Sequence, residues 1–85
     1  MEIRWNELKN KRLKRTRGVS FEEILKERWI AEIPHPKKAG QKVLLFEQKG
    51  YIGLVPFVKD EGGIFLKTLY ASRLYTWKYK KGELL

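Results

Sequence analysis

The residues best suited to chemistry lie close together near the end of the chain. Lys67 and Tyr70 fall in a predicted strand over residues 64–70, and Arg73 follows that strand. Together such groups could serve chemistry at a phosphate, in which a base takes a proton from the attacking hydroxyl, a cation stabilises the crowded phosphate and an acid protonates the leaving oxygen. Arg73 suits the phosphate, because a planar guanidinium can donate to two phosphate oxygens at once.

Lys67 and Tyr70 each have a structural explanation beside the chemical one. Strand alternation places Lys67 on one face with Phe65 and Leu69. A lysine among apolar neighbours either extends its amine to water or has a functional role. Tyr70 is either a proton carrier or an aromatic residue at the edge of the core. Both residues are kept as catalytic candidates.

His35 and Glu47 are two further candidates for proton transfer. His35 is the only histidine, and it stands between Pro34 and Pro36 in a predicted loop. Imidazole is the side chain whose unperturbed pKa lies nearest neutrality. The plain alternative is an exposed loop residue without a role. Glu47 interrupts an apolar strand face, so it is either a base or an exposed strand residue.

A dense basic run precedes these residues in the chain. Six of the nine positions from 9 to 17 are basic, and all six are candidate RNA contacts: Lys9, Lys11, Arg12, Lys14, Arg15 and Arg17. Basic side chains on one face of a helix can follow a phosphate backbone. We expect Lys11, Lys14 and Arg15 to point away from a buried stripe containing Trp5 and Leu8. The alternative is a solvated helix face.

The predicted elements begin with a short strand over residues 1–5 and a helix over residues 7–16. Asn6 is a favourable N-cap for this helix, and Gly18 is a natural stop after it. A second helix is predicted from Phe21 to about Ala31. Ser20 and Glu23 form a capping box at its start, which is the strongest local signal in the chain.

Three strands and a last helix follow. The strands are predicted over residues 42–48, 51–58 and 64–70, with a hairpin turn at Lys49-Gly50. Ser72 caps a predicted helix over residues 73–81. The expected fold is therefore α+β with the order β-α-α-β-β-β-α. Two N-terminal helices should cover one face of an antiparallel sheet.

Composition limits the classes of function. With 85 residues, the chain is expected to be a single domain over residues 1–85. It has no cysteine and one histidine, so thiol chemistry, disulfides and a zinc site with thiolate ligands are excluded, and we expect no metal or other cofactor. No apolar run approaches the ~20 residues of a membrane span. The charged N-terminus lacks a signal core, so a cytoplasmic protein is expected.

Charge is the strongest clue to a partner. There are 19 basic and 10 acidic residues, a formal net charge of +9. Such a balance favours a polyanion. Nucleic acid is the first choice, an acidic protein chain is the second, and simple solubility is the third.

Two segments resemble a known family. Trp5-Asn6-x-x-Lys9 followed by Arg17-Gly18-Val19-x-Phe21 resembles the opening of the BrnT family of toxins. Ala71-Ser72-Arg73-x-x-Thr76 is similar to the Ser-Ala-Arg-x-x-Thr stretch before the last helix of that family. Arg17 stands where the family often has histidine, and Tyr79 where it often has glutamate.

The resemblance implies a RelE-like fold and a function. By this likeness the chain would be the toxin of a type II toxin-antitoxin system and a metal-independent endoribonuclease. Its partners would be RNA and a small DNA-binding antitoxin, with oligomers formed only with that antitoxin. Two other functions stay open from the residues alone: a non-catalytic basic module that binds nucleic acid, and an interaction protein for an acidic partner chain.

Overall fold

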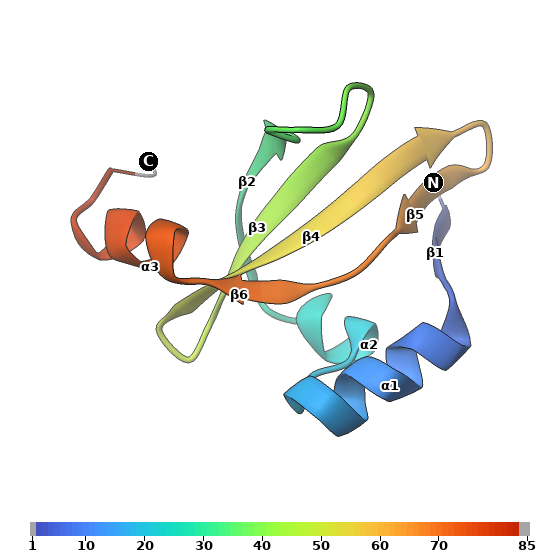
Figure 1. The fold of residues 1–85 in the computed structure, drawn as a ribbon, viewed down its shortest axis with the longest axis horizontal. Coiled ribbons are helices and arrows are strands. Elements are labelled where there is room, and N and C mark those ends of the chain that lie inside the picture. Colours follow the sequence, from blue (N-terminus) through green and yellow to red (C-terminus); the bar gives the residue numbers. More distant parts are fainter. Residues whose placement is uncertain (1, 84–85) are drawn as a thin grey trace.

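A mixed sheet forms the centre of the molecule (Figure 1). The computed structural model describes residues 2–83, and within them the chain forms six strands and three helices. The strand order is β1-β5-β4-β3-β2, and β6 also pairs with β4. The strands are β1 (Glu2–Trp5), β2 (Arg28–Pro34), β3 (Lys42–Gln48), β4 (Tyr51–Asp60), β5 (Gly63–Leu66) and β6 (Tyr70–Ser72). The helices are α1 (Glu7–Arg17), α2 (Phe21–Ile24) and α3 (Arg73–Lys80).

The sheet combines antiparallel and parallel pairs. β3 pairs antiparallel with β4, and β4 with β5, as the sequence predicts. The prediction of a wholly antiparallel sheet is wrong, because β1 runs parallel to β5. Parallel neighbours need a long crossover connection. Here the crossover contains both N-terminal helices and strands β2 to β4, which sequence-local signals cannot reveal.

The second predicted helix is much shorter than expected. Its start is confirmed: Ser20 accepts from the Glu23 amide, and the Glu23 side chain accepts from the Ser20 amide. It ends at Ile24 and not near Ala31. Residues Arg28–Pro34 form β2 instead, antiparallel to β3. Trp29 and Ile30 have weaker helix preferences than the preceding residues and favour strands, so pairing with the apolar strand β3 overrides the helix signal.

The last predicted strand is divided into two. β5 ends at Leu66, and β6 begins at Tyr70. The chain between them changes neighbours along β4, from Phe57 beside Leu66 to Leu54 beside Tyr70. Ser72 then caps α3 as predicted. This division moves Lys67 out of the sheet, so the prediction that it shares a strand face with Phe65 and Leu69 is wrong.

Both faces of the middle strands are buried. On one face, side chains from α1 and α2 pack with alternate residues of the sheet: Leu13, Phe21, Ile24, Leu44, Phe46, Val55, Phe57 and Leu66. On the other face, Tyr75 and Tyr79 of α3 pack against the complementary set: Val43, Leu45, Ile52 and Leu54. A strand buried on both faces needs a continuous apolar run, which explains the sequence Val43-Leu44-Leu45-Phe46.

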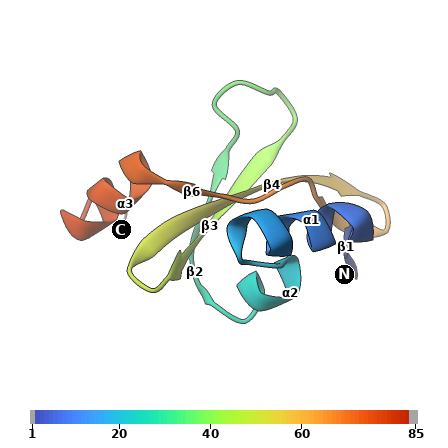
Figure 2. The ribbon, with the colours of Figure 1, turned by 60° about the horizontal axis from the view of Figure 1, so that its bottom comes forward.

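Helix α1 is held by few apolar contacts. Its buried residues are Leu13 and Asn10. The Asn10 amide group donates to Glu22 Oε1 at 2.6 Å, and its oxygen accepts from the Phe21 amide at 2.7 Å, so it joins α1 to α2. The predicted stripe is wrong at Leu8, which is 76% exposed on the outer side of α1. Figure 2 shows α1 and α2 side by side below β6.

Within residues 2–83, no helix has the length and apolar character needed to span a membrane.

Candidate nucleic-acid interface

Two hydroxyl groups fix the start of α3 to the sheet. Ser72 Oγ accepts from the Tyr75 amide at 3.1 Å. Thr76 is only 6% exposed, and its hydroxyl donates to the Ser72 carbonyl at 2.6 Å. The same oxygen accepts from the Ile52 amide of β4 at 2.9 Å. The first turn of α3 is therefore joined to a central strand through hydrogen bonds that satisfy buried groups.

Arg73 lies between these two anchors and is itself exposed. Within residues 2–83, its guanidinium has no ion pair and no hydrogen bond. The first turn of α3 carries no acidic residue to neutralise it. The fold thus presents an unneutralised arginine on a backbone that is held in place, which is what binding of a phosphate requires.

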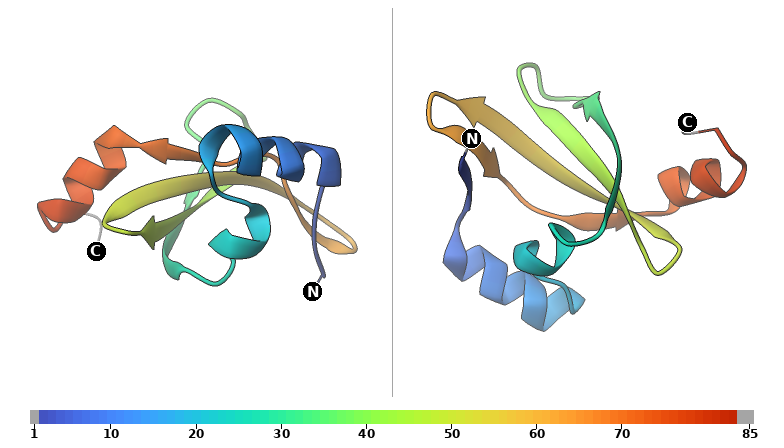
Figure 3. Two further views of the ribbon diagram at one scale, coloured as in Figure 1. Left: turned by 90° about the horizontal axis from the view of Figure 1, so that it is seen from below. Right: turned by 180° about the vertical axis from the view of Figure 1, so that it is seen from behind.

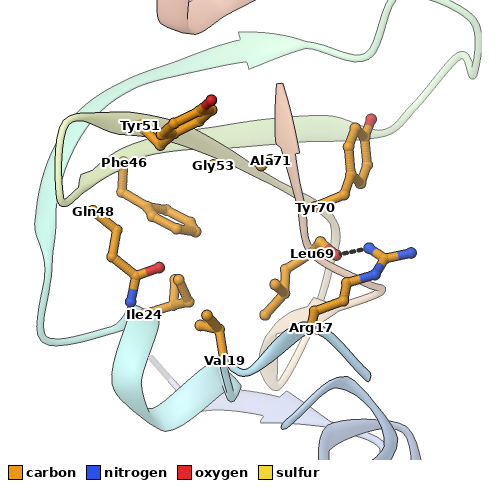
Figure 4. Close-up of a pocket in the computed structure, with 10 residues that line it drawn as sticks. All are labelled: Arg17, Val19, Ile24, Phe46, Gln48, Tyr51, Gly53, Leu69, Tyr70 and Ala71. Carbon is orange, nitrogen blue, oxygen red and sulfur yellow. Dashed lines mark hydrogen bonds between the residues drawn. The ribbon is translucent and has the colours of Figure 1, made fainter. Parts of the chain in front are cut away.

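A second arginine reaches the opposite end of β6. Arg17 is the last residue of α1, and its Nη1 donates to the carbonyl oxygen of Leu69 (Figure 4). Leu69 immediately precedes β6, and Arg73 immediately follows it. The three residues of β6 separate these points, a distance of four residue steps, so the two ends are at most about 13 Å apart. β6 pairs only with β4 within the described residues, so its other edge is open.

A cleft of about 190 Å³ adjoins this edge. Figure 4 shows Val19 and Ile24 on one side and Phe46, Tyr51 and Ala71 on the other. Gly53 lies opposite Phe46 in the sheet, and a Cβ there would be 2.8 Å from the Phe46 ring. Glycine at this position therefore lets the ring lie across β4. The polar lining residues are Arg17, Gln48, Tyr51 and Tyr70.

The structure brings three sequence-predicted residues to this edge. Tyr70 begins β6 and lines the cleft. Arg73 follows β6. Lys67 is exposed in the segment before β6, and its amide donates to the Pro56 carbonyl at 2.8 Å. Its Nζ is 5.9 Å from the centroid of the Phe65 ring.

Glu47 has a structural partner elsewhere. It accepts a hydrogen bond from the Tyr79 hydroxyl at 3.1 Å and lies 4.0 Å from the Arg28 guanidinium. The hydrogen bond with Glu47 raises the pKa of Tyr79, because it favours the protonated phenol. In this structure Glu47 helps to hold α3 against the sheet.

His35 lies at the far end of the sheet from Arg73. Its loop precedes Lys42, which pairs with Phe57, whereas Ser72 pairs with Ile52 near the other end of β4. His35 Nδ1 accepts from the amides of Lys37 and Lys38 at 3.0 and 3.1 Å. The ring thus closes its own loop and is not brought together with Arg73.

The basic residues of α1 differ in their surroundings, and Lys9 is half-buried. Lys14 Nζ is 2.8 Å from Glu23 Oε1 and 3.3 Å from the Gly18 carbonyl, so it belongs to the joint between α1 and α2. It and the Ser20 donors lower the pKa of Glu23 to about 2. Arg17 donates a hydrogen bond to the carbonyl oxygen of Leu69. Three cations are left exposed and without ion pairs within residues 2–83: Lys11, Arg12 and Arg15.

Sequence reasoning missed Tyr51 and Gln48 as lining residues. They face each other across the Lys49-Gly50 turn. Alternation along β3 and β4 would have placed them on the same face as Phe46. Their proximity to Arg17 and Tyr70 could not be read from the sequence, because it depends on the pairing of β6 with β4.

Comparisons with known proteins do not assign the chain to a family: no protein-family model, no curated protein and no solved structure matches it.

Proposed function

We propose that the chain is the toxin of a type II toxin-antitoxin pair, similar to the BrnT family, and a metal-independent endoribonuclease that binds RNA along β6. The observation that carries this proposal is the placement of Arg73, exposed between two residues, Ser72 and Thr76, that anchor α3. An exposed arginine of this kind could serve several functions, and the resemblance to the BrnT family is the reason for choosing RNA cleavage.

The proposed chemistry uses the groups at this edge. Attack of the 2′-oxygen on phosphorus crowds negative charge onto the phosphate oxygens, and the bond to the 5′-oxygen breaks. Arg73 would donate to those oxygens in two directions, and Arg17 would add a second positive charge. Tyr70 and Lys67 are the proposed proton carriers. We leave His35 and Glu47 out of the site, because their side chains serve a loop and α3.

The proposed partners follow from the same resemblance. A small DNA-binding antitoxin would bind the toxin and block it, and oligomers would form only with that antitoxin. The proposed site of action is the cytoplasm, where RNA is the substrate.

A specific observation favours a second candidate function, a non-catalytic module that binds RNA. The residues that line the cleft include no carboxylate and no histidine among residues 2–83. Phosphate binding and base stacking need neither group.

Incubation of purified protein with RNA in EDTA separates these two functions. The toxin proposal expects cleavage that resists EDTA and stops when the candidate antitoxin is added. Binding without cleavage would favour the module. Lys37→Ala is the matched control, because this exposed lysine lies in the loop at the far end of the sheet.

A further inference from the structure

Helix α3 lies at one end of the molecule (Figure 3). Its residues 73–80 include exposed aromatic and basic side chains. Tyr75, Thr76 and Tyr79 of this helix turn towards the sheet. Leu74 and Trp77 are exposed, and Trp77 retains 54% of its accessible surface. Residues 73–80 contain no acidic residue. An exposed tryptophan among basic residues has the features of a surface that binds a flat, negatively charged ligand.

Tyr51 connects this surface to the cleft beside β6. It follows the hairpin turn and is 52% exposed. Lys80 Nζ of α3 lies 5.9 Å from the centroid of its ring. Lys81 Nζ lies 4.1 Å from the centroid of Trp77 and 3.7 Å from Glu83 Oε2. Trp77 and Lys80 are three residues apart and so share one side of α3. Since Tyr51 contacts Lys80 and also lines the cleft, it connects this side of α3 to the cleft.

We infer that Tyr51 and Trp77 are stacking platforms for the unpaired bases of single-stranded RNA, with Lys80 and Lys81 binding the adjoining phosphates. The choice of RNA as the ligand rests on the proposed function above. The inference narrows the proposed substrate from RNA in general to single-stranded RNA. Bases within a duplex are stacked on one another and cannot lie on protein rings. A single strand offers both free base faces and phosphates, and it matches the rings and cations of this surface.

A lipid surface is the main alternative ligand for exposed leucine, tryptophan and lysine. The structure favours RNA over a membrane for two reasons. The helix has only eight residues, and it exposes two large apolar side chains, which is little area to insert among lipids. Tyr51 also extends the surface towards the cleft, whose lining includes Arg17.

The test measures the affinity of the full chain for three probes at fixed salt. They are a single-stranded oligoribonucleotide with a 2′-O-methyl group at each position to prevent cleavage by 2′-hydroxyl attack, a self-complementary RNA hairpin protected in the same way, and vesicles containing phosphatidylserine. The variants are Trp77→Ala, Trp77→Leu, Trp77→Phe and Tyr51→Ala. Trp29→Ala is the control, because Trp29 is 43% exposed and lines a separate cleft with Ile3 and Lys59.

We expect the single strand to bind more tightly than the hairpin. Trp77→Ala and Tyr51→Ala should each weaken single-strand binding roughly tenfold, the size typical of one stacked base. Trp77→Leu should lose as much as Trp77→Ala, whereas Trp77→Phe should retain most of the affinity, because stacking needs an aromatic ring. Trp29→Ala should bind like the wild type.

Three results would overturn the inference: equal affinity of Trp77→Leu and the wild type for the single strand, an equal loss in Trp29→Ala, or a loss in Trp77→Ala that is confined to vesicles. The outcome is separable from that of the proposed function. If the wild type cleaves RNA in EDTA while Trp77→Leu binds normally, the stacking inference fails and the toxin proposal stands. If stacking is confirmed and cleavage is absent, the ribonuclease proposal fails and the binding site stands.

Discussion

Glu23 gathers three hydrogen bonds where α1 meets α2. Its carboxylate accepts from Lys14 Nζ at 2.8 Å and from the amide and hydroxyl of Ser20, both at 3.0 Å. These donors favour the ionised form and lower the pKa of Glu23 from its ordinary 4.5 to about 2. The ionisation of Glu23 is therefore coupled to the contact between α1 and α2, which positions the end of α1.

This ionisation should appear as a pH-dependent stability. Because the folded pKa is below the unfolded one, the stabilisation is present above pH 4.5 and is lost as the pH falls towards 2. Glu23→Gln lacks the charge at every pH. We expect the melting temperature of the wild type to exceed that of Glu23→Gln at pH 7, and the gap to shrink below pH 4.5. A gap that stays constant down to pH 2 in matched melting curves would contradict this.

The pairing of β1 with β5 depends on one glycine, Gly63. Gly63 has φ of +139°, and a Cβ there would lie 2.0 Å from the Glu2 carbonyl oxygen. Gly63 is the partner of Glu2 in the parallel pair of β1 and β5. The close approach of the two backbones therefore requires a residue without a side chain.

Gly63→Ala should separate β1 from β5. Gly40→Ala is the control, since Gly40 also has a positive φ, +79°, but nothing lies within 4 Å of a Cβ there. Gly40→Ala should cost only the conformational strain, about 1 kcal/mol. Gly63→Ala should cost clearly more, because backbone atoms must also move. Denaturant unfolding of both variants measures the difference, and equal costs would show that the contact with Glu2 is not required.

The sequence allowed the local signals of these elements to be read correctly. The Asn6 cap, the Gly18 stop, the capping box at Ser20 and the cap at Ser72 are all present. The turn at Lys49-Gly50 is also confirmed, with positive φ at both residues. Each of these depends on neighbours within a few positions, where propensity and hydrogen bonding act directly.

The errors concern contacts between distant segments. Residues 28–31, the first half of β2, are predicted as helix because the pairing of β2 with β3 is not encoded in their own periodicity. Apolar spacing alone also predicts a buried stripe that contains Leu8. The structure exposes Leu8, and α1 buries Leu13 and the polar residue Asn10. For the site, Arg73, Tyr70 and Lys67 were predicted together because they are near in sequence. The contact of Arg17 with Leu69 spans 52 positions and could not be anticipated.

Across the whole molecule, two groups of basic residues are connected to β6. One is the outer side of α1, with Lys11, Arg12 and Arg15. The other is the end of α3, with Lys80 and the C-cap residue Lys81. Arg17 connects α1 to β6, and Tyr51 connects α3 to the cleft beside β6. We therefore expect RNA to contact both faces when it lies along β6.

Salt dependence tests that arrangement. Each neutralised phosphate of a single strand contributes about −0.7 to the slope of log affinity against log salt. Replacement of Lys11, Arg12 and Arg15 together by alanine should flatten the slope by about 2 units if all three contact phosphates. Lys37 and Lys38, replaced together, should leave it unchanged. An unchanged slope in the α1 variant would remove α1 from the path of the RNA.

We propose that Arg73 stabilises the transition state of RNA cleavage. Measuring EDTA-resistant cleavage by Arg73→Ala together with its melting curve tests this role. We predict an unchanged melting temperature, RNA binding within several-fold of the wild type, and a rate lower by about 10²–10³, the usual effect of losing one preorganised donor. Arg73→Lys should restore only part of the rate, because an ammonium lacks the planar fork. Full EDTA-resistant activity in folded Arg73→Ala, or a loss of activity that merely follows a lower melting temperature, would contradict the claim.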